Sequence, residues 1–199
     1  APLSLDMLAV LLGGAVALMP IFAKDILHVG STGYGLLLAA PAVGALLMSL
    51  VIAHMRPFRR VGKILLWCVA GYGICMVIFG ASKSFALSMI VLFFAGGLDS
   101  VSVMIRHTLV QVITPDYLRG RVSAVNGVFI GVSNELGGFE SGTVAKFIGP
   151  VATVILGGIG TVLVVAGVVF KWPELAKVNT LQEAAEEAKS KFDDAPELI

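Results

Sequence analysis

The chain has 199 residues, of which 57% are hydrophobic and 14% are charged, and its formal net charge at pH 7 is +1. Soluble domains carry about 25% charged residues, so this composition excludes an ordinary water-soluble globule. The charge balance also gives no support to nucleic-acid binding, which needs a basic surface.

Six apolar segments follow one another, each near the length of about 20 residues that a helix needs to cross a bilayer. Hydropathy and the breaks at Gly, Pro and charged residues place them at about residues 3–22, 34–55, 64–80, 85–105, 122–143 and 150–170. Backbone amides in lipid must be satisfied within the segment, so these runs fit helices better than barrel strands. We therefore expect an all-α membrane protein with six transmembrane helices in residues 1–172.

The first segment starts almost at the beginning of the sequence. Ala1 is not an initiator Met, no basic stretch precedes the apolar run, and no small-residue cleavage site follows it. These features indicate a membrane span rather than a signal peptide. We also expect an amino-terminal portion of the protein to precede this sequence.

Lys and Arg are unequally divided between the two sides of the predicted topology. One side holds Arg56, Arg59, Arg60, Lys63, Arg106, Arg119, Arg121, Lys171, Lys177, Lys189 and Lys191, and the other holds Lys24, Lys83 and Lys146. Basic residues accumulate on the cytoplasmic side of membrane proteins. We therefore expect both termini in the cytoplasm and three short outward loops.

Beyond the last apolar segment, residues 173–199 are polar and predict a partly helical cytoplasmic tail. Thr180 and Glu183 have the spacing of a capping box, which indicates a helix start. The mixed charges of this tail are explained by solvation and need no partner.

The fourth segment carries a carboxylate at membrane depth. Asp99, Ser102 and Arg106 share one face of a helix that turns about 100° per residue. Charged groups are costly in lipid, so Asp99 and Ser102 either line a pathway for protons or substrate, or Asp99 belongs to a structural or gating ion pair. Arg106, Arg119 and Arg121 are the candidate partners for such a pair at the cytoplasmic end.

Small residues form a stripe along the fifth segment, with one carboxylate in it. We call this the small-residue stripe, and it consists of Ser123, Gly127, Gly131, Glu135, Gly138 and Gly142. Such spacing lets another helix approach closely, or it lines a cavity. Glu135, with Asn134 beside it, lies about 20 Å from the inner end of the predicted span, and an acid at that depth suits reversible protonation in a pathway. A packing glutamate bound to a neighbouring hydroxyl is the alternative, and Glu140 is expected near the interface.

No residue pattern indicates catalysis. His28, His54 and His107 all fall at predicted helix ends, and no two of them have metal-ligand spacing. No Ser combines a nucleophile setting with a membrane-embedded His. We therefore expect neither an enzyme nor a bound metal or cofactor.

Three stretches carry a family resemblance. They are TPDYLRGRVSAVN at residues 114–126, SNELGGFESG at residues 133–142 and WPEL at residues 172–175. Together with Asp99 to Ser102 and Arg106, they resemble the carboxy-terminal half of major facilitator exporters of the drug antiporter group, which includes siderophore exporters. The resemblance extends over about residues 1–178 and implies a location in the bacterial inner membrane.

The resemblance implies that the six segments correspond to helices seven to twelve of a twelve-helix transporter, arranged as two inverted three-helix repeats. It also implies that the first, second, fourth and fifth segments line the cavity or the seam between the halves, which includes Asp99 and Glu135. The loop at residues 56–63 resembles the signature loop of the family but lacks its acidic residue.

Two functional hypotheses remain open at this point. The first is secondary active, proton-driven efflux of a small amphipathic molecule, siderophore or drug-like, by alternating access, with the lipid bilayer and a missing amino-terminal six-helix half as partners. The second is a stand-alone six-helix subunit or a homodimeric carrier. The gene upstream of Ala1 decides between them. The first hypothesis requires that it encode six further spans, and the second requires a stop codon there.

Overall fold

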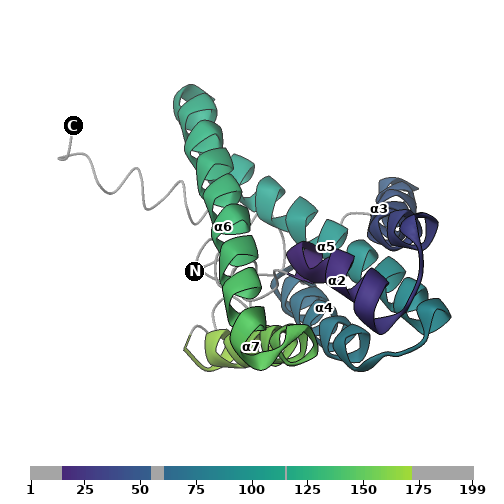
Figure 1. Cartoon of the computed structure of the whole chain (residues 1–199). Helices are drawn as coiled ribbons and strands as arrows, with labels where there is room; N and C mark the ends of the chain where they lie inside the picture. The colour runs from purple at the N-terminus through teal and green to yellow at the C-terminus, as the bar shows by residue number, and fades with distance from the viewer. Residues whose placement is uncertain (1–14, 55–60, 115, 172–199) are drawn as a thin grey trace.

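A computed structural model describes residues 15–54, 61–114 and 116–171, and within them every regular element is a helix or a helical turn. Figure 1 shows the long helices, which are α3 (Ser31–His54), α4 (Val61–Ala81), α5 (Phe85–Ile113), α6 (Arg119–Ile148) and α7 (Pro150–Lys171). A short 3₁₀ turn, η3 (Asp116–Leu118), leads into α6. The predicted tail, residues 173–199, lies outside the described residues.

The chain begins its described part with an irregular helix. It passes from a 3₁₀ turn, η1 (Ala15–Leu18), through α2 (Met19–Ile21) into a π-helical turn, η2 (Phe22–Ile26). Pro20 lacks a backbone N–H and cannot complete a regular ladder here. The Leu27 N–H instead donates to the Phe22 carbonyl at 2.8 Å, and His28 takes a left-handed φ of 51° that ends the segment.

Within the described residues, four helices are long and apolar enough to cross a membrane: Ser31–His54, Val61–Ala81, Phe85–Val112 and Pro150–Phe170. Helix α6 has 30 residues and is long enough, but it is not one of the four. Its small and polar residues, including Asn126, Asn134 and Glu135, lower its hydropathy. Most of the first predicted span lies outside the described residues, so the structure supports the all-α membrane class and describes fewer than six spans.

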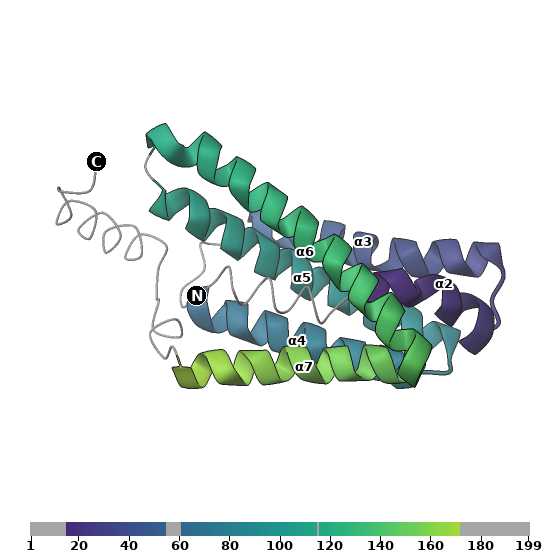
Figure 2. The ribbon, with the colours of Figure 1, turned by 60° about the vertical axis from the view of Figure 1, so that its left-hand side comes forward.

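The helices lie side by side in the order α7, α4, α5 and α3, each packed on the next, as Figure 2 shows. Helix α6 crosses this layer at an angle and packs against α7 and η1. The result is that α5 and α6 have different main neighbours. They therefore present their polar residues to different surroundings.

Glycines bring α3 and α5 to very close approach. A Cβ on Gly44 would overlap the Phe93 carbonyl, and a Cβ on Gly96 would overlap the backbone of Pro41. The Ser49 and Ser100 hydroxyls meet across the same interface at 2.9 Å. Because lipid offers no hydrophobic drive for helix association, such close backbone packing and hydrogen bonds hold the two helices together.

A second close crossing joins α4 to α7. A Cβ on Gly73 would lie 2.8 Å from the Gly158 carbonyl oxygen, and a Cβ on Gly158 would lie 2.6 Å from the Gly73 carbonyl oxygen. The arrangement is reciprocal, so each glycine makes room for the backbone of the other helix. Gly44 and Gly96, like Gly73 and Gly158, are thus packing residues at these two crossings.

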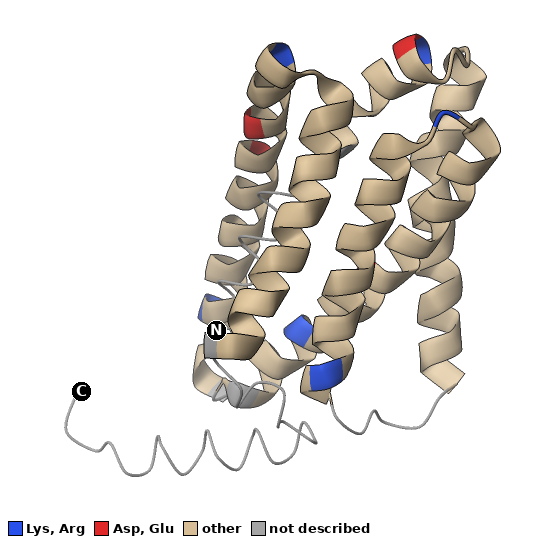
Figure 3. Cartoon of the chain, turned by 90° about the horizontal axis from the view of Figure 1, so that it is seen from below, with Lys and Arg blue, Asp and Glu red and all other residues tan. Residues whose placement is uncertain are grey.

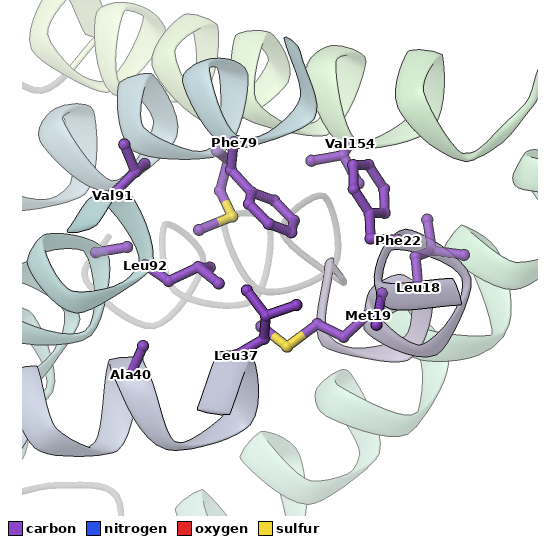
Figure 4. Close-up of a cluster of buried hydrophobic side chains, with 12 residues drawn as sticks. Leu18, Met19, Phe22, Leu37, Ala40, Phe79, Val91, Leu92 and Val154 are labelled. Carbon is purple, nitrogen blue, oxygen red and sulfur yellow. The ribbon is translucent and has the colours of Figure 1, made fainter. Parts of the chain in front are cut away.

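Buried apolar side chains form two clusters at the two ends of the bundle. The cluster that the predicted topology places on the outer side, here called the outer cluster, joins the irregular first helix to α3, α4, α5 and α7. Figure 4 shows its side chains pointing toward one another. In it, the Phe22 and Phe79 rings stack with centroids 4.8 Å apart. The inner cluster is built from α3, α4, α5 and α7, with Val61, Leu65 and Ile105 among its members.

Two helices extend beyond their predicted ends. Helix α5 continues to Ile113 instead of residue 105, so Arg106 lies inside the helix and not in a loop. Thr114 is extended with φ −90° and ψ 126°, as expected before Pro115. Helix α6 spans Arg119–Ile148 instead of residues 122–143, because polar ends do not interrupt a helix, and it stops at Gly149 with φ 86°.

Lys and Arg gather at the two ends of the bundle, whereas the acidic positions of α6 lie between its ends, as Figure 3 shows. Lys24 lies on η2, Lys83 lies between α4 and α5, and Lys146 lies in the last turn of α6. The membrane orientation of these ends stays a prediction.

Candidate transport pathway

Helix α6 carries three different faces. The buried face consists of Asn126, Ser133, Gly137 and Ser141, all of them small or polar. The second face is exposed and apolar, and it includes Val125, Val128, Phe129, Val132, Leu136 and Phe139. The small-residue stripe lies between the other two. The buried face thus packs on the helix's own bundle and the apolar face suits lipid, whereas the small-residue stripe suits neither.

Most of the small-residue stripe is not covered by another described helix. Ser123, Gly127, Gly131 and Glu135 are exposed, and no atom would lie within 4 Å of a Cβ added to Gly127 or Gly131. Gly138 approaches another element, since an added Cβ would lie 3.7 Å from the Ala17 Cβ. Most of the stripe therefore faces away from the helices that the structure describes.

Glu135 and Asn134 are both exposed on this helix. Glu135 lies about 24 Å along the axis from Arg119 and about 20 Å from Ile148, so it is near the middle of α6. Glu140 is half-buried and lies about 140° around the helix from Glu135. The two carboxylates thus point in different directions, and only Glu135 belongs to the stripe.

Asp99 is exposed halfway along α5, about 21 Å from each end of the helix. Its charge acts on the phenol of Tyr72, which is half-buried at the middle of α4. The sequence prediction missed Tyr72 because it lies in an apolar run with no charge nearby in sequence. The sequence did offer one signal for Tyr72, which is a phenolic hydroxyl in the middle of a predicted span. Buried Tyr hydroxyls usually have a hydrogen-bond partner.

Ser102 lies one turn from Asp99 but points elsewhere. Its side chain is 2% exposed, and its hydroxyl has no hydrogen-bond partner in the described part of the chain. The Asn126 side-chain oxygen on α6 is likewise buried there without a partner. Such groups are uncommon in native structures, so each marks a place where packing and polarity are in conflict.

The arginines proposed for a gate lie near the opposite end of the bundle from Lys83 and Lys146. Arg106 is half-buried two turns before the end of α5, and Arg119 and Arg121 are exposed in the first turn of α6. The Arg119 Nε donates to the Thr114 carbonyl at 3.3 Å, which ties the start of α6 to the end of α5. An ion pair of Asp99 with one of these arginines stays a prediction.

The predicted site residues therefore fall into two groups. Asp99 and Ser102 lie on α5, which packs on α3 and α4, whereas Asn134 and Glu135 lie on α6, which packs on α7 and η1. Asp99 and Glu135 lie at similar distances along their helices, about 21 Å from Phe85 and about 20 Å from Ile148. Among the described residues, no three His, Cys, Asp or Glu side chains come together as a metal site would require.

Known proteins with similar sequences are described as exporters. The enterobactin exporter EntS of Citrobacter koseri is 27% identical over 137 residues, which are 69% of this chain and 33% of that protein. EntS of Escherichia coli O81 is 26% identical and EntS of Shigella dysenteriae serotype 1 is 25% identical, each over 130 residues, which are 65% of this chain and 31% of each relative. The chain thus matches about a third of the length of these relatives.

No solved structure matches the chain. The family profile described as transmembrane secretion effector matches residues 7–197, almost the whole sequence. Together with the apolar helices, these findings support a multi-pass protein of the bacterial inner membrane. The chain belongs to the transmembrane secretion effector family of major facilitator transporters.

Proposed function

We propose that the protein is a secondary active exporter that moves a small amphipathic molecule across the inner membrane by alternating access. The observation that carries this proposal is the exposure of two carboxylates, Asp99 and Glu135, halfway along helices of a transporter family. A carboxylate at this depth is too costly to leave against hydrocarbon, so each one faces a polar pathway or a partner.

The architecture that fits this role is a six-helix half-transporter in residues 1–172, built as two inverted three-helix repeats, with both termini and the tail at 173–199 in the cytoplasm. A second six-helix half precedes it and completes the cavity. Two observations support this proposal. The small-residue stripe is open to a further helix, and the curated relatives are about three times as long as the matched region.

The substrate that we propose is a siderophore or a drug-like molecule. The support is the name of the relatives, which are enterobactin exporters at 25 to 27% identity. We further propose proton coupling, with Glu135 as the group that gains and loses the proton as the cavity opens to either side. Its support is the position of Glu135 on the exposed stripe near the middle of α6.

The test uses the complete gene product that contains this chain, reconstituted in proteoliposomes with a pH-sensitive dye inside. Enterobactin is added on one side, and both its movement and the accompanying proton flux are measured. We expect Glu135→Gln to lower the substrate-driven proton flux about tenfold or more, because glutamine cannot exchange a proton.

Glu140→Gln is the matched control, since it makes the same chemical change five residues away on another side of the helix. It should stay within about twofold of wild type. Unchanged proton flux in Glu135→Gln would contradict the coupling role of Glu135. If the wild-type protein moves neither enterobactin nor a lipophilic cation such as ethidium, the export proposal itself is wrong.

A further inference from the structure

One end of the bundle carries basic residues on four neighbouring helices. We call them the basic rim, which consists of Lys63 on α4, Arg106 on α5, Arg119 and Arg121 on α6, and Lys171 on α7. Figure 3 shows Lys and Arg positions gathered at this end. Among the described residues, the acidic residue at this end is Asp116 on η3. The other described acidic residues lie on η2, halfway along α5 and in the second half of α6.

The packing of α4, α5 and α7 places three of these residues at a common level. The inner cluster joins the start of α4, the second half of α5 and the end of α7, with Val61, Ile105 and Val168 among its members. Lys63, Arg106 and Lys171 each follow one of these cluster members by one to three residues. They therefore lie at the same end of three helices that pack side by side.

Helix α6 brings two further arginines to this end, farther from the middle of the bundle. After Arg106, α5 continues for seven residues to Ile113, which is about 10 Å along its axis. The Arg119 Nε donates to the Thr114 carbonyl at 3.3 Å, so the first turn of α6 lies beside the end of α5. Arg121 is exposed in the same turn. The basic rim thus has a lower step on α4 and α7 and an upper step on α6.

The sequence that follows α7 has the opposite charge. Residues 172–199 contain seven Asp or Glu and three Lys, a formal net charge of −4 on their side chains. In the helix that the sequence predicts from Thr180 onward, Glu183, Glu186 and Glu187 share one face, because they are three and four residues apart. This acidic segment follows directly on Lys171, so it is tethered beside the basic rim.

The acidic segment is long enough to reach both steps of the basic rim. Glu183 is twelve residues from Lys171, and twelve extended residues span up to about 40 Å. Helices α7, α4 and α5 pack in that order with axes about 8–10 Å apart, so about 20 Å separates α7 from α5. Lipid headgroups gather at one level, where the spans end, and so fit the lower step alone. A tethered polypeptide fits both steps, and its tether gives it a local concentration in the millimolar range.

We propose that the acidic segment, residues 172–199, docks on the basic rim, with the carboxylates of Glu183, Glu186 and Glu187 against Lys63 and Arg121. Arg119 keeps its bond to the Thr114 carbonyl and adds its charge to the upper step. Exposed ion pairs are individually weak, so the contact depends on several pairs together and on the tether. The docked segment acts as a clamp between the starts of α4 and α6. It requires neither a particular membrane orientation nor the export function.

Crosslinking of the complete gene product in phosphatidylcholine nanodiscs, one copy per disc, tests the contact. A carbodiimide joins a Lys amine directly to a carboxylate that touches it, and mass spectrometry of the digest identifies the joined peptides. We expect Lys63 to be joined to Glu183, Glu186 or Glu187. Lys83 and Lys146, at the other end of the bundle, are the internal controls and should not be joined to this segment. A segment that is merely solvated predicts no such preference.

Paired substitutions test the role of charge. Arg119→Gln with Arg121→Gln should lower the yield of the Lys63 crosslink at least about threefold, because the upper step no longer holds the segment. Lys24→Gln with Lys83→Gln is the matched control, since it removes the same charge at the other end of the bundle and should leave the yield unchanged.

Hydrogen exchange supplies a second readout, which no crosslinker perturbs. Amides of residues 180–192 should exchange more slowly at low salt than at about 0.5 M salt, where exposed charges are screened. Glu183→Gln, Glu186→Gln and Glu187→Gln together should remove this difference. These substitutions lie outside the bundle of α3 to α7, so they keep the test valid if the arginine variants fail to fold.

Three results would overturn the proposal. They are the absence of a Lys63 crosslink, equal crosslinking of Lys63 and Lys146, and salt-independent exchange in residues 180–192. Nanodiscs that contain phosphatidylglycerol separate the segment from lipid as the occupant of the basic rim. The crosslink should persist in them, whereas its loss would show that anionic headgroups occupy the rim in place of the segment.

Discussion

The crossing of α3 and α5 yields a sharp stability test, because two adjacent glycines of α5 differ in the space around them. A Cβ on Gly96 would overlap the backbone of Pro41, which cannot rotate out of the way. A Cβ on Gly97 would meet its nearest atom, the Gly44 carbonyl oxygen, at 3.5 Å, an ordinary contact. Gly96→Ala should therefore destabilise the protein, and Gly97→Ala should not.

The size of the effect follows from the geometry. To accept an alanine at position 96, α3 and α5 must separate by about 1 Å, since united carbon atoms pack at about 3.5 to 4 Å. Overpacking of this kind costs about 1–3 kcal/mol. The separation would also stretch the 2.9 Å hydrogen bond between Ser49 and Ser100 beyond bonding range.

Thermal unfolding of the detergent-solubilised protein measures the difference. With about 2–4 °C per kcal/mol for a chain of this size, Gly96→Ala should melt about 3–10 °C below wild type. Gly97→Ala should melt at or slightly above wild type, because alanine favours a helix by up to about 1 kcal/mol over glycine. Equal melting temperatures for the two variants would refute the close crossing.

Two further substitutions test other parts of the structure. Gly131→Leu should leave the melting temperature within about 2 °C of wild type, because no described atom lies near an added side chain at this position. The same substitution should abolish transport in the complete protein, because the leucine would block the approach of the other half. Val132→Leu on the apolar face is the control, and intact transport in Gly131→Leu would count against the proposed seam. Gly149→Ala should lower the free energy of unfolding by about 1–3 kcal/mol, because φ is 86° and ψ is 156°, a conformation that essentially only glycine adopts. Gly142→Ala, at a position of α6 with free space around it, should leave stability unchanged. Equal melting temperatures for the two variants would contradict the strained turn.

Several features of the fold were predictable because they depend on local sequence. The starts of α3 to α7 lie within three residues of the predicted starts, since apolar runs bounded by Gly, Pro and charge define where a helix can cross lipid. The ends of α5 and α6 were predicted too early. Hydropathy marks where a helix leaves the membrane and not where its hydrogen bonds stop, so Arg106 and Lys146 lie inside their helices.

The candidate site was predictable in part. The carboxylates Asp99 and Glu135 stand out in apolar sequence, and both are exposed near the middle of their helices. The orientation of Ser102 was not predictable, because the two sides of α5 face different neighbours and one turn separates an exposed residue from a buried one. Tyr72 was missed since its proximity to Asp99 depends on the packing of α4 on α5.

The sequence by itself determined that this is an α-helical membrane protein, where its apolar helices begin, and which acidic residues lie near the middle of its long helices. These properties follow from the cost of leaving backbone and charged groups unsatisfied in hydrocarbon, which acts on each segment separately. Only the tertiary structure decided which glycines close the crossings of α3 with α5 and α4 with α7, and which stay open along α6. Small residues at helical spacing serve packing and cavities equally well, so their role depends on which neighbouring helix the fold places against them.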